Sequence, residues 1–129
     1  MSLDPTSLPR STLEFLVERH LATLTTLRSD GSPHVVPVGF SYDPALQLVR
    51  IITFEGSTKV RNAERGGRAV VSQVDGGRWL SLEGTVTATQ DPDRVAAAVA
   101  GYAARYRQPG ERDGRVALEI QVDRILGRA

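Results

Sequence analysis

Residues 21–38 read LATLTTLRSDGSPHVVPV, two alternating stretches separated by a polar turn. In Leu21–Leu27 every second residue falls on the same side, and β-branched residues are frequent, which is typical of a β-strand. Asp30-Gly31 tolerates the positive φ that a tight hairpin turn needs. The chain then returns over His34–Tyr42, so this stretch predicts two antiparallel strands.

Pro37 lies within the second of these strands and has no amide hydrogen. The strand therefore has an unpaired position there, which predicts a sheet edge, a bulge or a neighbouring ligand. Gly84 lies within a later strand and predicts a bend or bulge for a related reason, because glycine weakens a regular ladder.

The rest of the chain alternates between short periodic stretches and turns. Further strands are predicted at Leu46–Phe54, Arg68–Val74, Arg78–Thr89 and Arg115–Asp123, with the first three strands forming a meander. Helices are predicted at Ser11–His20, with Ser11 and Glu14 as a capping box, at Lys59–Arg65, and after Asp91, with Pro92 at the first helical position. Six mostly antiparallel strands without regular strand–helix alternation exclude a doubly wound sheet. The pattern predicts a mainly β (α+β) fold, a small six-stranded antiparallel barrel with short peripheral helices.

Length and composition narrow the possible functions. A chain of 129 residues favours one domain, which we expect at residues 11–129 behind a flexible arm at residues 1–10. The net charge of +1 is too small for a protein that binds nucleic acid by neutralising many phosphates. The chain has no cysteine, which excludes disulfides and thiolate chemistry. With no apolar run of about 20 residues and only two histidines, we expect a cytoplasmic protein without a membrane partner or a metal site.

The sequence Gly56-Ser57-Thr58-Lys59 directly precedes a predicted helix. Free amides, two hydroxyls and an ammonium group would meet there, which suits a phosphate. Lys59 is also the only lysine of the chain. A simpler interpretation is that Ser57 or Thr58 only caps the helix while Lys59 is solvated, and spacing alone does not choose between the two.

Other candidate residues have equally plain alternatives. Trp79, the only tryptophan, could line a planar ligand or an interface, or could simply pack at the rim of the core. Arg61 and Arg65 could receive an anion or form a solvated helix face. No histidine lies at a recognisable spacing from a nucleophilic serine, so no catalytic residue is identified. The chain lacks an obvious reactive group of its own, which suggests a borrowed cofactor.

Several segments, taken in order, resemble the split β-barrel flavin and deazaflavin oxidoreductases related to pyridoxamine phosphate oxidase. These segments are LATLTTL at 21–27, DGSPHVVPV at 30–38, GSTKVRN at 56–62, SQVD at 72–75 and RWLSLEG at 78–84. The resemblance covers about Arg19 to Val122. It implies a split barrel of the FMN-binding type, present as a homodimer with two cofactors at the interface.

The resemblance also assigns cofactor-binding positions. Ser57, Thr58 and Lys59 match the phosphate-binding residues, and Trp79 matches a cofactor-contacting position. The strand along the tricyclic ring would carry Val35, Val36, Pro37 and Val38, with Thr53 at the end of the next strand beside it. The anionic groups of the acceptor and of the cofactor tail would meet cationic side chains at the rim of the site. The candidates are Arg28, His34, Arg61, Arg65 and Arg78, and the sequence does not rank them.

Within this family the pattern is most similar to the coenzyme F420-dependent biliverdin reductases. That similarity implies hydride transfer from reduced coenzyme F420 to a conjugated small-molecule acceptor such as biliverdin, with a proton from solvent or a nearby cationic group. The alternatives are an FMN-dependent reductase or oxidase, because the phosphate loop would serve either cofactor, and a noncatalytic F420- or flavin-binding protein. The chain ends at Ala129 without the C-terminal extension of the oxidase, so we do not expect vitamin B6 oxidation.

Overall fold

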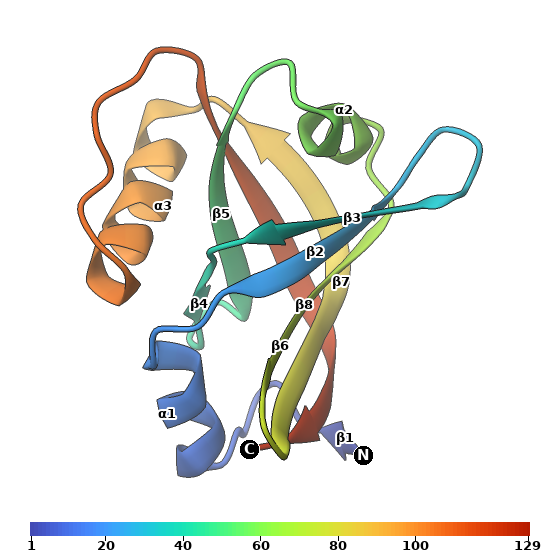
Figure 1. The fold of residues 1–129 in the computed structure, drawn as a ribbon, viewed down its shortest axis with the longest axis vertical. Helices are drawn as coiled ribbons and strands as arrows, with labels where there is room; N and C mark the ends of the chain where they lie inside the picture. The colour runs from blue at the N-terminus through green and yellow to red at the C-terminus, as the bar shows by residue number, and fades with distance from the viewer.

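The computed structural model describes residues 1–129, which form one curled sheet with three helices around it (Figure 1). The strands are β1 (Ser2–Leu3), β2 (Ala22–Leu27), β3 (Pro33–Val38), β4 (Ser41–Asp43), β5 (Leu48–Phe54), β6 (Arg68–Asp75), β7 (Arg78–Thr89) and β8 (Arg115–Arg128). The helices are α1 (Arg10–Val17), α2 (Thr58–Glu64) and α3 (Pro92–Arg105). None of the three is long and apolar enough to cross a membrane.

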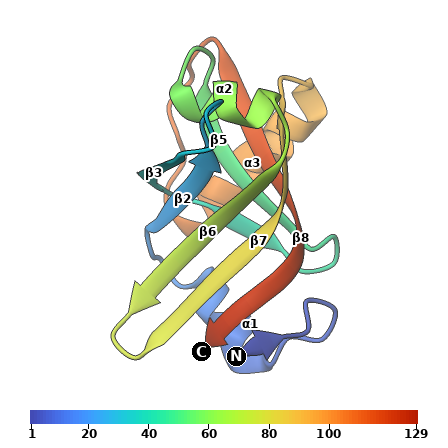
Figure 2. The ribbon, with the colours of Figure 1, turned by 90° about the vertical axis from the view of Figure 1, so that its right-hand side faces the viewer.

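The strand order is β3-β2-β6-β7-β8-β5-β4, with β1 attached to the end of β8, and every pairing is antiparallel. The long strands β6, β7 and β8 run side by side along one wall of the barrel (Figure 2). At the other wall, β3 forms one end of the order and does not pair with β5. The barrel is therefore split between β3, at one end of the sheet, and β5 with β4 at the other end.

The core fills the inside of this barrel, because alternate residues of the strands point inward. In β2 the buried side chains are Ala22, Leu24 and Thr26, as the period of two predicts. The largest fully buried apolar side chains come from most elements of the fold: Phe15, Leu24, Phe40, Val49, Ile51, Val71, Leu80, Leu82, Leu118, Ile120 and Ile125.

The predicted fold class is confirmed, but the sheet has eight strands instead of six, and the predicted meander is wrong. The predicted strand His34–Tyr42 breaks at Gly39 and Phe40 into β3 and β4. At Gly39 the rings of Tyr102 and Tyr106 pack so closely that a Cβ would lie 3.0–3.2 Å from them. As a result, β3 pairs with β2, whereas β4 pairs with β5. The other partner of β5 is β8.

The N-terminal region also differs from the prediction. Residues expected to lack secondary structure include β1, which pairs with Leu126 and Ile125 of β8. The predicted capping box of α1 is wrong, because Pro9 is the N-cap and no side chain caps the helix. The Ser11 hydroxyl instead donates to the carbonyl of Ala129. The two ends of the chain therefore lie together, which local sequence does not reveal (Figure 2).

Three local predictions are confirmed. The register of β7 against β8 shifts between Glu83 and Gly84, where a Cβ on Gly84 would overlap the carbonyl of Gln121. The Asp91 side chain accepts from the amide of Arg94 at the start of α3. Pro37 lies on β3, the strand at the end of the sheet order, where its missing amide hydrogen is tolerated.

A buried arginine ties the helices to the sheet near the end of the barrel that carries α1. Arg105, at the C-terminal end of α3, is only 7% exposed. Its guanidinium donates to the carbonyls of Glu18 and Phe40 and to Oε1 of Gln73, at 2.7–2.8 Å. Gln73 in turn donates to the carbonyl of Phe15. Burial lowers the pKa of Arg105. Its N–H groups donate to neutral acceptors that come from three separate parts of the chain.

Candidate functional site

The connection from β5 to α2 is a short loop followed by a well-defined helix start. Gly56 has φ +84°, a left-handed conformation that side chains disfavour. Ser57 is the N-cap of α2, and its Oγ accepts from the amide of Val60 at 3.4 Å. The simpler interpretation of Ser57 as a cap is therefore confirmed. Its hydroxyl hydrogen is still available to an acceptor outside the loop, since capping uses only the oxygen.

The first turn of α2 has several donors that the protein itself leaves unused. The amides of Thr58 and Lys59 make no hydrogen bond, as expected at a helix start. The Thr58 hydroxyl oxygen accepts from Arg61, whose guanidinium also donates to the carbonyl of Gly56 at 2.6 Å. Arg61 therefore stabilises the loop from behind.

Lys59 differs from the arginines around it. Its side chain is half-buried, yet its ammonium group makes no hydrogen bond and no ion pair within the chain. Arg65, one turn further along α2, is held by the carbonyl of Leu27 and by Oδ1 of Asn62. Among the cations of α2, only the ammonium group of Lys59 is left without a partner in the chain.

The side chains of β3 alternate between the two faces of the sheet. Val36 packs against the core and Val38 is buried, whereas Val35 and Pro37 point outward, with Val35 55% exposed. A flat ring cannot touch all four side chains at once. A ligand along the free edge of β3 would meet the backbone of all four residues and the side chains of one face.

His34 lies on β3 near a hydrogen bond that joins β2 to α2. It lies opposite Thr26 in the register of β2 and β3, and Thr26 accepts a hydrogen bond from Asn62 of α2 at 3.0 Å. The Nδ1 atom of His34 is buried and has no hydrogen-bond partner. Buried polar atoms are normally paired, so this nitrogen is a candidate for contact with a ligand. The sequence identified His34 only as one of five rim candidates.

Thr53 lies near the end of β5, two residues before the loop that leads to α2. Its side chain is 6% exposed, and its register partner is Val116 of β8. Its hydroxyl makes no hydrogen bond within the chain. The structure therefore brings Thr53, the start of α2 and the N-terminal half of β3 to the same end of the split barrel (Figure 1).

Trp79 does not join this group. It opens β7 beside the β6–β7 turn and pairs with Val74. The α2 end of β7 lies near Val86, whose amide donates to the carbonyl of Gly67 just after the helix. Six strand residues lie between Trp79 and Val86, which places the two roughly 20 Å apart along the strand. Trp79 and Lys59 of the same chain therefore cannot hold one small group together.

Arg78, another rim candidate, is engaged at the Trp79 end of the sheet. It donates to both carboxylate oxygens of Glu18, at 2.9 and 3.0 Å, and to Asp75 at 2.7 Å. Arg78 lowers the pKa of Glu18 to about 2, with a smaller contribution from His20.

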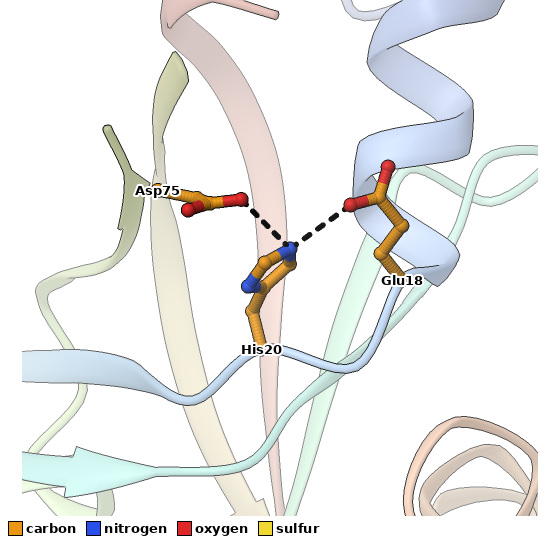
Figure 3. Close-up of side chains that lie close together, drawn as sticks. All are labelled: Glu18, His20 and Asp75. Atoms are coloured by element: carbon orange, nitrogen blue, oxygen red, sulfur yellow. Dashed lines mark hydrogen bonds and ion pairs between the residues drawn. The ribbon is translucent and has the colours of Figure 1, made fainter. Parts of the chain in front are cut away.

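Figure 3 shows the imidazole of His20 between the two carboxylates that Arg78 contacts. Its Nε2 lies 3.1 Å from Glu18 and 3.9 Å from Asp75. Three such groups can form a metal site, but here the guanidinium of Arg78 already balances both carboxylates. We therefore regard the cluster as a structural ion-pair network.

The donors at the start of α2 fit a phosphate group. A dianionic phosphate has several acceptor oxygens, and the first turn offers two free amides, two hydroxyls and an ammonium group without a partner. The neighbouring free edge of β3 offers backbone and apolar surface for a flat ring. This arrangement suits a phosphate-bearing planar cofactor and supplies no nucleophile of its own.

Comparison with known proteins identifies the family of this chain. The pyridoxamine 5'-phosphate oxidase family matches residues 8–129. An F420H(2)-dependent biliverdin reductase of Mycobacterium tuberculosis is 55% identical over 124 residues, which cover 96% of this chain and 90% of that protein.

Two solved structures share the fold at low sequence identity. One is a conserved hypothetical protein of Mycobacterium tuberculosis, with a TM-score of 0.79, 20% identity and coverage of 95% of this chain and 85% of the other. The second is an F420 reductase, with a TM-score of 0.74, 23% identity and coverage of 92% and 98%. The fold, the extent of the family match and the 55% identity establish that this chain belongs to the pyridoxamine 5'-phosphate oxidase family.

Proposed function

We propose that this protein is a reductase that uses reduced coenzyme F420 to convert biliverdin to bilirubin. The observation that carries the proposal is the ammonium group of Lys59, half-buried and without a partner, beside the free amides at the start of α2. The 55% identity to an F420H(2)-dependent biliverdin reductase favours F420 over FMN as the ligand of this site.

The cofactor would be held in two places. Ser57, Thr58 and Lys59 would bind its phosphate, and the edge of β3 from Val35 to Val38 would lie along its ring system, with Thr53 beside it. The alternation of β3 means that backbone atoms and the outward side chains of Val35 and Pro37 would provide much of this contact. When bound, reduced F420 supplies a hydride for an electron-poor methine carbon of the acceptor.

The residues of the chain position the reactants and exclude water. The acceptor gains a hydride and one proton, so a proton source completes the reaction. Either solvent or His34 would deliver it, since His34 has a buried ring nitrogen that no group of the chain uses. This division of labour explains why the chain shows no nucleophile and no catalytic triad.

The proposal includes a homodimer. The outer face of β2, β3, β6 and β7, which we call the outer sheet face, exposes several large apolar side chains together with the half-buried Trp79. The most exposed are Leu21, Leu27, Val35 and Val74, at 46–68%. Exposed apolar patches of this kind mark interfaces. A second copy covering the outer sheet face would bring Trp79 of the partner subunit toward the cofactor, which Trp79 of the same chain cannot reach.

Parallel titrations with F420 and FMN test the cofactor assignment. We expect quenching of deazaflavin fluorescence with saturation at one F420 per chain, and weaker binding of FMN. A purified protein that carries tightly bound yellow flavin would instead support an FMN-dependent enzyme.

Turnover tests the reaction. With reduced F420 and excess biliverdin, we expect many equivalents of cofactor to be consumed in the presence of a recycling system, with bilirubin as product. Oxidation limited to one equivalent would leave a noncatalytic binding protein.

Val74→Glu tests the homodimer. Val74 is 68% exposed on the outer sheet face, so a buried charge at an interface would shift the protein toward monomer in light scattering. Val17→Glu is a matched control, because Val17 is 70% exposed on α1, away from that face. A wild-type monomer, or equal masses for wild type and Val74→Glu, would contradict the homodimer.

A further inference from the structure

A pocket outside the proposed cofactor site lies between β5, α3 and the segment from Arg107 to Arg115. Its volume is about 430 Å³, within the range of small-molecule sites. Ile52 and Phe54 of β5 form its floor, and Tyr102 of α3 lines it as well. The proposed function assigns no role to this pocket.

The pocket is strongly basic. Arg107, Arg112 and Arg115 line it with a single acidic residue, Glu111, and none of the three arginines forms an ion pair within the chain. Arg115 donates to the carbonyl of Gly110 at 2.9 Å, but its Nε is buried and has no hydrogen-bond partner. An unsatisfied guanidinium nitrogen in a basic pocket indicates that an anion belongs there.

Aromatic stacking orients Arg112, one of the two exposed arginines of the pocket. The guanidinium carbon of Arg112 lies 3.5 Å from the centre of the Phe54 ring, and Arg112 makes no hydrogen bond. Stacking uses the face of the guanidinium and leaves the N–H groups at its edge free for a carboxylate. The combination of aromatic rings and arginines suits carboxylates carried by a flat, conjugated molecule.

The pocket is also close to the strand proposed to lie along the cofactor ring. Tyr102 lines the pocket and packs against Gly39, the residue that follows Val38 at the end of β3. Phe54 follows Thr53 in β5 and points to the other face of the strand. The pocket therefore adjoins both strands of the proposed cofactor site, β3 through Tyr102 and Gly39 and β5 through Phe54, on the face of β5 opposite to Thr53.

From these observations we infer that the pocket is the subsite for the carboxylates of the acceptor, with Arg112 and Arg107 as its principal ligands. This inference rests on the proposed function for the identity of the acceptor, in which the propionates of biliverdin are the carboxylates concerned. The carboxylates of the oligoglutamate tail of F420 share this chemistry, so the experiment must separate the two sources.

The test is a binding titration of the full chain saturated with oxidised F420, which has no hydride to transfer. Biliverdin and its dimethyl ester are titrated separately and followed by their visible absorption. Arg112→Gln should weaken binding of biliverdin roughly tenfold or more, as expected for loss of a charge-assisted hydrogen bond. Binding of the ester, which has no free carboxylate, and the Kd for F420 should be the same in wild type and variant.

Arg107→Gln should also weaken binding of biliverdin, so the conclusion does not depend on a single substitution. Arg10→Gln is the matched control, because it removes the same charge from a side chain that is 93% exposed on α1. Equal biliverdin affinity in wild type and both pocket variants would overturn the inference. A loss of F420 affinity with unchanged biliverdin affinity would also overturn it, by placing the cofactor tail in the pocket.

The same titration distinguishes failure of the proposed function. If F420 does not bind to the wild type, biliverdin is titrated against the chain alone, and a loss in Arg112→Gln still assigns the pocket to carboxylates. Wild-type turnover, measured separately, decides whether the bound molecule is a substrate.

Discussion

The end of the barrel that carries α1 and the end that carries α2 use their cationic side chains differently (Figure 1). Near α1, Arg105 donates three hydrogen bonds to neutral acceptors and Arg78 bridges two carboxylates. Near α2, Lys59 has no partner, and the amides beside it are free. The first arrangement stabilises the fold, whereas the second leaves donors available to a ligand. A cation without a protein partner is therefore the better guide to function in this molecule.

Replacing Arg105 should have the largest effect on stability. Arg105→Met keeps much of the side-chain volume but leaves the carbonyl of Glu18 and the Oε1 of Gln73 without a donor. The carbonyl of Phe40 would keep only the 3.3 Å hydrogen bond from the hydroxyl of Tyr106. We expect a loss of about 3–5 kcal/mol in the free energy of unfolding, because each buried acceptor left unpaired is costly. Urea unfolding measures it, with the exposed Arg10→Met as control. A loss below about 1 kcal/mol would show that water replaces Arg105 without cost.

Replacing Lys59 should separate binding from stability. Lys59→Ala removes an ammonium group that no residue of the chain uses, so the free energy of unfolding should change by no more than about 0.5 kcal/mol. Cofactor binding should weaken by about 1–3 kcal/mol, the range for a charge-assisted hydrogen bond. Fluorescence titration with F420 measures the affinity. An unchanged Kd would remove Lys59 from the phosphate site, and Arg61→Ala provides the comparison with a neighbouring cation that is already engaged.

The smallest expected effect is a dependence of stability on pH at the α1 end. The pKa of Glu18 is lowered to about 2 in the folded protein, mainly by Arg78, and has its ordinary value of 4.5 in the unfolded chain. A lowered folded pKa stabilises the protein above about pH 4.5, and this contribution is lost as the pH falls toward 2. Because the pair is exposed to solvent, screening keeps the effect small.

Urea midpoints of wild type and Glu18→Gln, measured between pH 6 and pH 3, test this expectation. The wild type should be the more stable at pH 6, and the difference should narrow as the pH falls. A constant difference across this range would mean that the ion pair with Arg78 does not persist in solution.

The sequence predicted most strands and turns, because these depend on neighbouring residues. Alternation in Leu21–Leu27, the positive φ at Gly31, the bulge at Gly84 and the cap at Asp91 all appear in the structure. The capping box at Ser11 was wrong because the hydroxyl of Ser11 bonds to the distant Ala129 instead of its own helix. Local patterns cannot show such a competing long-range partner.

The candidate site likewise has a part that the sequence predicted and a part that only the folded structure revealed. The residues proposed to bind phosphate, Ser57–Lys59, are consecutive, so their spacing was visible in the sequence. The basic pocket was not, because Phe54, Tyr102 and Arg112 come from three elements that only the folded chain brings together. The separation of Trp79 from Lys59 was hidden for the same reason.

By itself, the sequence determined the antiparallel β character of this protein, its turns and the cluster of hydroxyl and ammonium groups before α2 that is proposed to bind phosphate. These features follow from backbone preferences and side-chain spacing over a few residues. Only the tertiary structure decided that β5 pairs with β8, that the barrel is split between β3 and β5, and which cations are left without a partner. Those outcomes depend on packing between residues far apart in the chain, where the contacts of the whole sheet outweigh local preference.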